Sequence, residues 1–428
     1  MTSQSSSAIK QSGVNYVGYA IWGLTAIAFL LAPKVFTSGA AITTMSMMGI
    51  MIIFSLSYNM LLGQTGMLSF GHAVYYGLGG FLTVHAMNTF AAAKLAIPLP
   101  LLPLAGGVTG LIFGIIFGAV STRRAGTAFA MISLGLGELI ASMSLILRGF
   151  FGGEEGVTAN RTKLLRLFDI SYGPQIQVYY LIAVWCFLCM VLMFAWTRTP
   201  LGRMCNAVRE NPERAEFVGY STQMVRFITF CAAGFFAGIA GGLAAINFEL
   251  MNAINVSGAQ SGVVLLMTFI GGVGHFAGPI LGAVLVTLLQ TFLSDLTGAW
   301  MLYFGLLFIT MVIFAPGGIA GLILMHEPLI RRGSIGHVLP AYGAILVPAL
   351  LGLCGLSLLI EVAHHQLVKT ATEGPAMKFF GVAFASNTIP PWIAALALIV
   401  FGLWLGRRLA PMVIRGWAAA TATTGKGA

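Results

Sequence analysis

Apolar stretches of about 20 residues recur along almost the whole chain and alternate with shorter polar segments. A helix of that length crosses the roughly 30 Å hydrocarbon core of a bilayer. The pattern therefore predicts an all-α polytopic membrane protein, with about 10 transmembrane or broken helices followed by two further ones near the C-terminus. The candidate spans lie near residues 14–33, 41–62, 69–87, 97–121, 126–147, 178–196, 227–247, 259–272, 278–294, 300–323, 339–360 and 391–409.

Glycine positions refine this picture in two ways. The segments 69–87 and 259–294 are so rich in glycine that short, broken or re-entrant helices are expected there. Two sets of glycines recur every four residues, so each set lines one helix face and lets a neighbouring backbone approach closely. The sets are Gly106, Gly110, Gly114 and Gly118, and Gly234, Gly238 and Gly242.

Composition supports a location in the bilayer. Hydrophobic residues make up 58% of the chain and charged residues only 8%, with a mean hydropathy of +0.92, whereas soluble domains carry about a quarter charged residues. Most lysines and arginines fall in or beside residues 122–125, 197–226, 324–338 and 410–428. The positive-inside rule then predicts cytoplasmic N- and C-termini, with 1–13 as a cytoplasmic tail.

The sequence gives little support for nucleic-acid binding, disulfides, metal binding or catalysis. The basic residues form no interleaved basic and aromatic patch, so no nucleic-acid partner is expected. The five cysteines mostly fall in apolar runs, which predicts buried thiols rather than disulfides, and the adjacent pair His364 and His365 is not expected to bind a metal by itself. No catalytic motif and no phosphate-binding G-x-x-x-x-G-K-[ST] loop occurs, so we expect no catalytic residue and no cofactor in this chain.

The long charged interval 197–226 separates two spans. Pro200 and Pro212 each suit the first turn of a short helix, and Asn211 suits the cap of the second one. This predicts a helix-turn-helix element on the cytoplasmic face that docks on a soluble partner, although a solvated loop is the alternative reading.

Four motifs occur in the order found in one known family. They are residues 56–73 (LSYNMLLGQTGMLSFGHA), 199–219 (TPLGRMCNAVRENPERAEFVG), 269–283 (FIGGVGHFAGPILGA) and 314–322 (FAPGGIAGL). The chain resembles the branched-chain amino-acid permease family of ATP-binding-cassette importers, in its M-type subunit. The resemblance implies a permease domain over 14–324 and leaves 325–428 as an extension with two probable transmembrane helices.

The resemblance also implies partners and a compartment. These are a sister permease in a pseudo-symmetric heterodimer, two cytoplasmic ATPase subunits that hold ATP and magnesium, a periplasmic solute-binding protein, membrane lipid, and the bacterial inner membrane. Transport of branched-chain amino acids or a related small polar solute by alternating access would follow, and a stand-alone channel or secondary carrier is the alternative. The interval 148–177 is a candidate landing surface for the binding protein, or a simple loop.

Site residues follow from the motifs. Those implied for coupling to the ATPases are Gly202, Arg203, Arg209, Glu210, Asn211, Glu213 and Gly219. Polar groups at the first glycine-rich motif and one acid inside a predicted span are candidates for the solute path: Asn59, Gln64, Ser69, Gly71, His72 and Glu138. Irregular backbone at membrane depth needs hydrogen-bond partners, so these groups either line a path or satisfy freed backbone positions. Glu138 should face the bundle interior, as a contact for solute or for a neighbouring helix.

Overall fold

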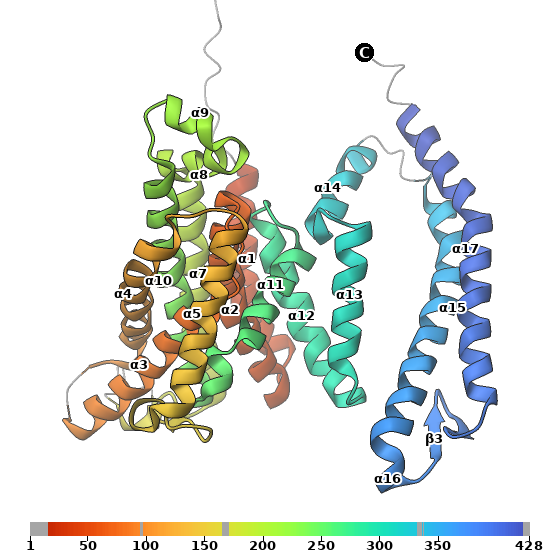
Figure 1. Ribbon diagram of the computed structural model, residues 1–428, viewed down its shortest axis with the longest axis horizontal. Coiled ribbons are helices and arrows are strands. Elements are labelled where there is room, and N and C mark those ends of the chain that lie inside the picture. The colour runs from red at the N-terminus through yellow and green to blue at the C-terminus, as the bar shows by residue number, and fades with distance from the viewer. Residues whose placement is uncertain (1–15, 95–96, 165–170, 332–335, 337, 423–428) are drawn as a thin grey trace, which may run out of the picture. The chain divides into compact units, whose positions relative to one another are not determined.

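The computed structural model describes residues 16–94, 97–164, 171–331, 336 and 338–422 (Figure 1). The predicted tail 1–13 lies outside these residues, as does part of the interval 148–177. The chain divides into two units, residues 1–262 and 263–428. Helices dominate both, so the expectation of an all-α polytopic membrane protein is confirmed.

The first unit is a bundle of long apolar helices. Its helices are α1 (Tyr16–Val35), α2 (Gly39–Asn59), α3 (Ala73–Ala92), α4 (Leu102–Ser121), α5 (Thr127–Ile146), α6 (Arg148–Phe151), α7 (Gln175–Arg198), α8 (Pro200–Glu210), α9 (Pro212–Phe217) and α10 (Thr222–Phe248). A π-turn, η1 (Met60–Gln64), prolongs α2, and 3-10 turns occupy η2 (Leu99–Leu101), η3 (Arg161–Lys163) and η4 (Ala253–Val256). Two short antiparallel strands, β1 (Val157–Thr158) and β2 (Leu250–Met251), pair with Val157 opposite Met251. Helix α11 (Gly258–Gly271) begins in this unit and continues into the next.

The core of the first unit lies around α10, which packs most extensively against α4 and α3. The two predicted glycine faces meet there. A β-carbon built on Gly238 would overlap the carbonyl oxygen of Gly106, and one built on Gly110 would overlap that of Gly234. Both sets of glycines are therefore needed for this packing, because a side chain at either position would hold the two backbones apart.

The second unit contains the remaining helices and a hairpin. They are α12 (Ala277–Leu296), α13 (Trp300–Phe314), α14 (Gly318–Arg331), α15 (Leu339–His364), the π-turn η6 (His365–Lys369), α16 (Thr370–Glu373), the antiparallel strands β3 (Ala376–Phe379) and β4 (Val382–Ala385), and α17 (Pro390–Ala422). Figure 1 shows α15 and α17 side by side, where Gly355 and Gly402 allow close contact between the two backbones.

Eight helical segments of the described chain are long and apolar enough to cross a membrane, or nine when one bent pair counts as a span. That pair differs from the expected single span at 300–323. Helices α13 and α14 meet at an angle of 43°, because Pro316 and the glycines beside it interrupt the helix. Helix α11 has only 14 residues, in line with the short segment expected at 259–272.

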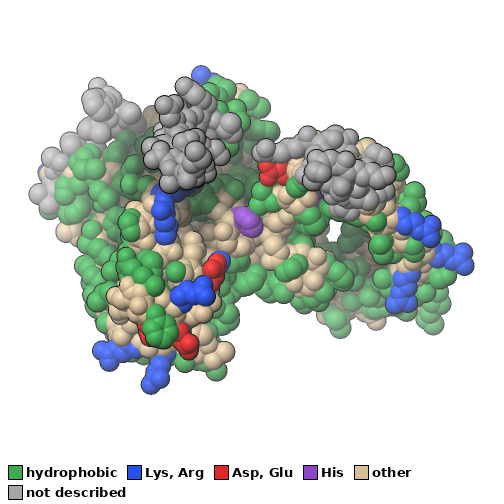
Figure 2. All heavy atoms as spheres, turned by 90° about the horizontal axis from the view of Figure 1, so that it is seen from above, with side chains coloured by type: hydrophobic (Ala, Val, Ile, Leu, Met, Phe, Trp, Pro, Cys, Tyr) green, Lys and Arg blue, Asp and Glu red, His purple; other side chains and the backbone are tan. Residues whose placement is uncertain are grey.

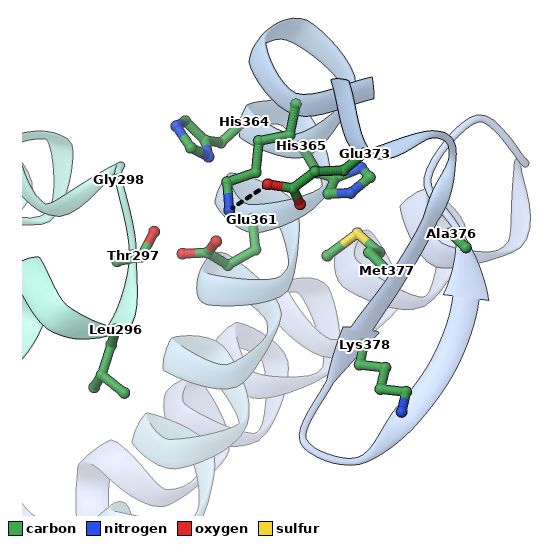
Figure 3. A pocket seen from close by; sticks show the side chains of 11 residues that line it. Leu296, Thr297, Gly298, Glu361, His364, His365, Glu373, Ala376, Met377 and Lys378 are labelled. Atoms are coloured by element: carbon green, nitrogen blue, oxygen red, sulfur yellow. Dashed lines mark ion pairs between the residues drawn. The ribbon is translucent and has the colours of Figure 1, made fainter. Parts of the chain in front are cut away.

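A cavity of about 270 Å³ lies in the second unit beside the β3–β4 hairpin (Figure 3). Three of its charged residues have partners: Lys369 pairs with Glu373 at 3.6 Å, and Glu361 accepts a hydrogen bond of 3.0 Å from Tyr303. His365 bonds to the Ser386 hydroxyl at 3.0 Å. Leu296, Thr297 and Gly298, which precede the extension, also line the cavity.

Removing residues 339–428 is expected to lower the melting temperature of the detergent-solubilised protein by several degrees. The truncation deletes Glu361 and Tyr342, and Tyr342 hydrogen-bonds His326 of α14 at 2.7 Å. Thermal unfolding of the two lengths measures the effect, and Tyr342→Phe in the full chain serves as a milder comparison. An unchanged melting temperature would show that residues 339–428 do not stabilise the rest of the chain. Uptake by the shortened protein tests whether transport needs them.

Candidate functional site

The first glycine-rich motif forms an interruption between α2 and α3. The helix widens into the π-turn at Met60–Gln64, and Gly66 then adopts a positive φ of 70° before the backbone turns toward α3. Asn59 and Gln64 lie in this segment, both buried. A broken helix was expected here, and irregular backbone inside a membrane protein needs hydrogen-bond partners from the protein or from a water-filled cavity.

His72 is fully buried at the end of this loop and belongs to an aromatic cluster. Its Nε2 lies 2.9 Å from the Ser57 hydroxyl, and its ring stacks on Phe54. Tyr58 donates a hydrogen bond of 3.0 Å to the backbone carbonyl of Ser69. These contacts tie the loop to α2, and both roles proposed for its polar groups, lining a path and satisfying freed backbone positions, stay predictions.

Three buried polar atoms of the motif have no hydrogen-bond partner among the described residues. They are Oε1 of Gln64, Oγ of Ser69 and Nδ1 of His72. An unpaired buried polar group costs about 1–3 kcal/mol. A segment that retains three of them within nine positions is suited to contact with water or a polar solute.

Two remote serines hold the loop in place. The backbone N–H of Phe70 donates to Oγ of Ser133 in α5 at 3.0 Å, and that of Ala73 donates to Oγ of Ser261 in α11 at 3.0 Å. A β-carbon on Gly71 would overlap the carbonyl oxygen of Ser133. The break after α2, the middle of α5 and the first turn of α11 therefore meet at one point.

Glu138 directly follows Gly137, which packs against Gly71. Its side chain is exposed in the single chain, so it does not face the interior of this bundle as expected. A β-carbon built on Gly258, the first residue of α11, would lie 3.1 Å from Oε1 of Glu138. The carboxylate thus sits beside a helix N-terminus, where the helix dipole favours negative charge.

The charged interval folds as two short helices, as the sequence predicts. Thr199 caps α8 by accepting from the N–H of Gly202 at 3.1 Å, and Asn211 caps α9 by accepting from the N–H of Arg214 at 3.0 Å. Pro200 and Pro212 occupy the first position of each helix. Both helices are therefore fixed by local sequence, which makes the element rigid.

The helix pair packs on the start of α10 through a small apolar cluster. Its buried members are Cys205, Val208, Ala215 and Val225. Burial raises the pKa of the Cys205 thiol, and this thiol lies 3.1 Å from the Thr229 hydroxyl, so Cys205 packs as a neutral side chain.

The opposite face of the helix pair is open. Arg203, Glu210 and Glu213 are exposed, and Phe217 at the end of α9 is 90% exposed. Gly219 follows with a positive φ of 90°, a conformation that suits glycine at the turn into α10. A large exposed aromatic ring among mixed charges is the usual composition of a protein-docking surface.

Arg209 points the other way. Its guanidinium donates a hydrogen bond to the backbone carbonyl of Gly63, in the π-turn after α2, and pairs loosely with Glu210 at 3.9 Å. The aliphatic part of its side chain lies against Gly66. The helix pair is thus bonded directly to the break in α2, a connection that the sequence motif did not reveal because Gly63 is remote in the chain.

Arg161 organises the segment at the other end of α10. Its guanidinium donates to the last carbonyls of α10, at Ile246 and Asn247, and its backbone N–H donates to Glu249 at 2.8 Å. The strands β1 and β2 pair next to it. The described part of 148–177 is therefore a folded surface anchored to α10 rather than a loose loop.

Figure 2 shows hydrophobic side chains over much of the visible surface, with lysine and arginine side chains scattered among them. Apolar helices, one of them interrupted by a glycine-rich loop and bonded to a polar helix pair, define a polytopic membrane permease. The family described as branched-chain amino acid transport system / permease component matches residues 40–316, and the chain belongs to it.

Similar proteins of known name support the same family assignment. The chain is 28% identical over 314 residues to the high-affinity branched-chain amino acid transport system permease protein LivM of Salmonella typhimurium, covering 68% of this chain and 72% of the relative. It is 27% identical to LivM of Escherichia coli, with 68% and 71% covered. The permease protein LivH of Escherichia coli is 22% identical over 63% of this chain and 90% of its own length. No solved structure matches the chain.

Proposed function

We propose that this chain is one of two permease subunits of an ATP-binding-cassette importer that moves branched-chain amino acids, or a related small polar solute, by alternating access. It is the M-type partner of a sister permease in the bacterial inner membrane, with both termini in the cytoplasm. The relatives named LivM and LivH are both permease proteins of branched-chain amino acid transport systems, which supports a pair of unlike subunits.

The observation that carries the proposal is the α8–α9 pair. It offers an exposed docking face at Arg203, Glu213 and Phe217, and it is bonded to the interrupted helix through Arg209. A channel has no use for such a rigid element. Two cytoplasmic ATPase subunits, which hold ATP and magnesium, dock here and push the pair as a rigid body. A periplasmic binding protein delivers solute at the surface that Arg161 organises.

The docking face is tested by replacing Phe217 and Val218 with serine. The complex with the sister permease and the ATPases is expected to lose its ATPase subunits during purification in mild detergent, because the replacements remove the most exposed apolar surface of the helix pair. Ile254→Ser, at an apolar residue that is 66% exposed and lies beyond the opposite end of α10, is the control and should keep them.

Copurification of the ATPases at wild-type levels with the double variant would contradict this docking site. Failure of the wild-type chain to retain any ATPase under several mild conditions would favour a stand-alone channel or secondary carrier.

A further inference from the structure

One stripe of α5 is exposed along the whole helix. Its members are spaced alternately three and four residues apart, which is the spacing of a helix-packing seam. They are Ala128, Met131, Gly135, Glu138, Ser142 and Leu145. We call this set the α5 stripe. Its small residues Gly135 and Ser142 let another backbone approach closely.

A carboxylate stands near the middle of the stripe. Glu138 is the only acidic residue of α5, and α5 is apolar enough to cross a membrane. Placing a carboxylate at the centre of a lipid-facing helix costs at least about 2.5–3.5 kcal/mol. The stripe therefore does not face lipid.

No described side chain of this chain pairs with the carboxylate. No described residue forms a hydrogen bond or an ion pair with Glu138. The helices α2, α3, α4 and α5 contain no lysine or arginine. These four helices therefore supply no positive side chain to pair with Glu138.

The position of Glu138 indicates what kind of group it meets. The carboxylate lies beside the first residue of α11, and the glycine-rich loop contacts Ser133 and Gly137 of the same helix α5. In transporters built from broken helices, such meeting points of helix ends near mid-membrane hold the solute. Phe70, in the same loop and 38% exposed, offers an apolar surface near this point.

We propose that Glu138 binds the ammonium group of the amino-acid solute as the solute passes between the α5 stripe and the sister permease. This inference rests on the function proposed above and names the residue through which the permease recognises an amino acid. A carboxylate and an ammonium group form short charge-assisted hydrogen bonds, roughly twice as strong as neutral ones. The apolar side chain of the solute lies against Phe70.

The test uses the complete importer, with binding protein and ATPases, in proteoliposomes supplied with labelled leucine. In Glu138→Gln we expect ATP-driven leucine uptake to fall at least about tenfold, the loss of a charge-assisted contact. Assembly of the complex and stimulation of ATP hydrolysis by loaded binding protein are expected to stay at wild-type levels. Glu138→Asp should restore part of the uptake, because it keeps the charge. The matched control Glu373→Gln makes the same chemical change at a carboxylate of the extension and should transport normally.

Two results would overturn the assignment. Wild-type uptake by Glu138→Gln would show that no ammonium group depends on this carboxylate. Loss of the sister subunit from the variant complex would show that Glu138 pairs with a residue of that subunit instead. If the wild-type complex itself moves no leucine, the proposed function fails at that step, and the wild-type sample alone reveals it.

Discussion

Replacing Arg209 with alanine is expected to reduce ATP-driven uptake by about ten- to a hundredfold while leaving the ATPases bound. The guanidinium of Arg209 donates to the carbonyl of Gly63, and a hydrogen bond from a charged group contributes about 1.5–3 kcal/mol. Without it the helix pair α8–α9 still docks but no longer moves the break after α2. Uptake and ATPase copurification are measured on the same membrane preparation. Copurification reports docking of the ATPases, and uptake reports whether their movement reaches the break after α2.

Conservative and matched variants show whether the bond itself matters. Arg209→Lys keeps the charge but lacks the planar fork, so it should recover only part of the uptake. Arg123→Ala makes the same change at an exposed arginine outside the helix pair, one that bonds the carbonyl of Ala119 four residues earlier, and should transport normally. Loss of the ATPases from Arg209→Ala would show instead that Arg209 acts as a docking contact, and normal uptake would leave it without a coupling role.

Gly238→Ala is expected to destabilise the protein by about 1–3 kcal/mol or more, the usual cost of overpacking a core. The new methyl group overlaps the carbonyl oxygen of Gly106 and crowds the α-carbon of Gly110. Because these atoms are backbone, the whole of α4 has to move away from α10. Thermal unfolding in detergent should show a melting temperature lower by several degrees.

Gly23→Ala provides the comparison. Gly23 lies in α1 with no other atom near the position of a β-carbon, and alanine favours a helix over glycine by about 1 kcal/mol. This variant should melt at or slightly above the wild-type temperature. Equal melting temperatures for Gly238→Ala and wild type would mean that α4 and α10 are not in close contact.

The parts of the fold that the sequence predicted well depend on local chemistry. Pro200 and Pro212 supply the first turn of α8 and α9, and Asn211 supplies a cap, so the helix pair could be derived from a few adjacent residues. The glycine repeats on α4 and α10 predicted close packing for the same reason. The sequence does not say which two faces pair, and the structure shows that they pair with each other.

Other features depend on contacts between distant residues. Ser133 and Ser261 hold the glycine-rich loop from two other helices, and nothing near either serine in the sequence signals that role. The orientation of the Arg209 side chain could not be predicted either, because its acceptor, the carbonyl of Gly63, belongs to another helix. Glu138 was expected to face inward on the assumption that one chain forms a closed bundle, whereas its exposure shows a surface that a single chain leaves open.

Helix α10 connects two folded surfaces without a break. Its 27 residues extend over about 40 Å, from the cluster that seats α8 and α9 to the carbonyls held by Arg161. Because α10 is one unbroken helix that is held at both ends and packed along its length against α3 and α4, we expect a displacement of one end to be transmitted to the other. The two folded surfaces would then move together.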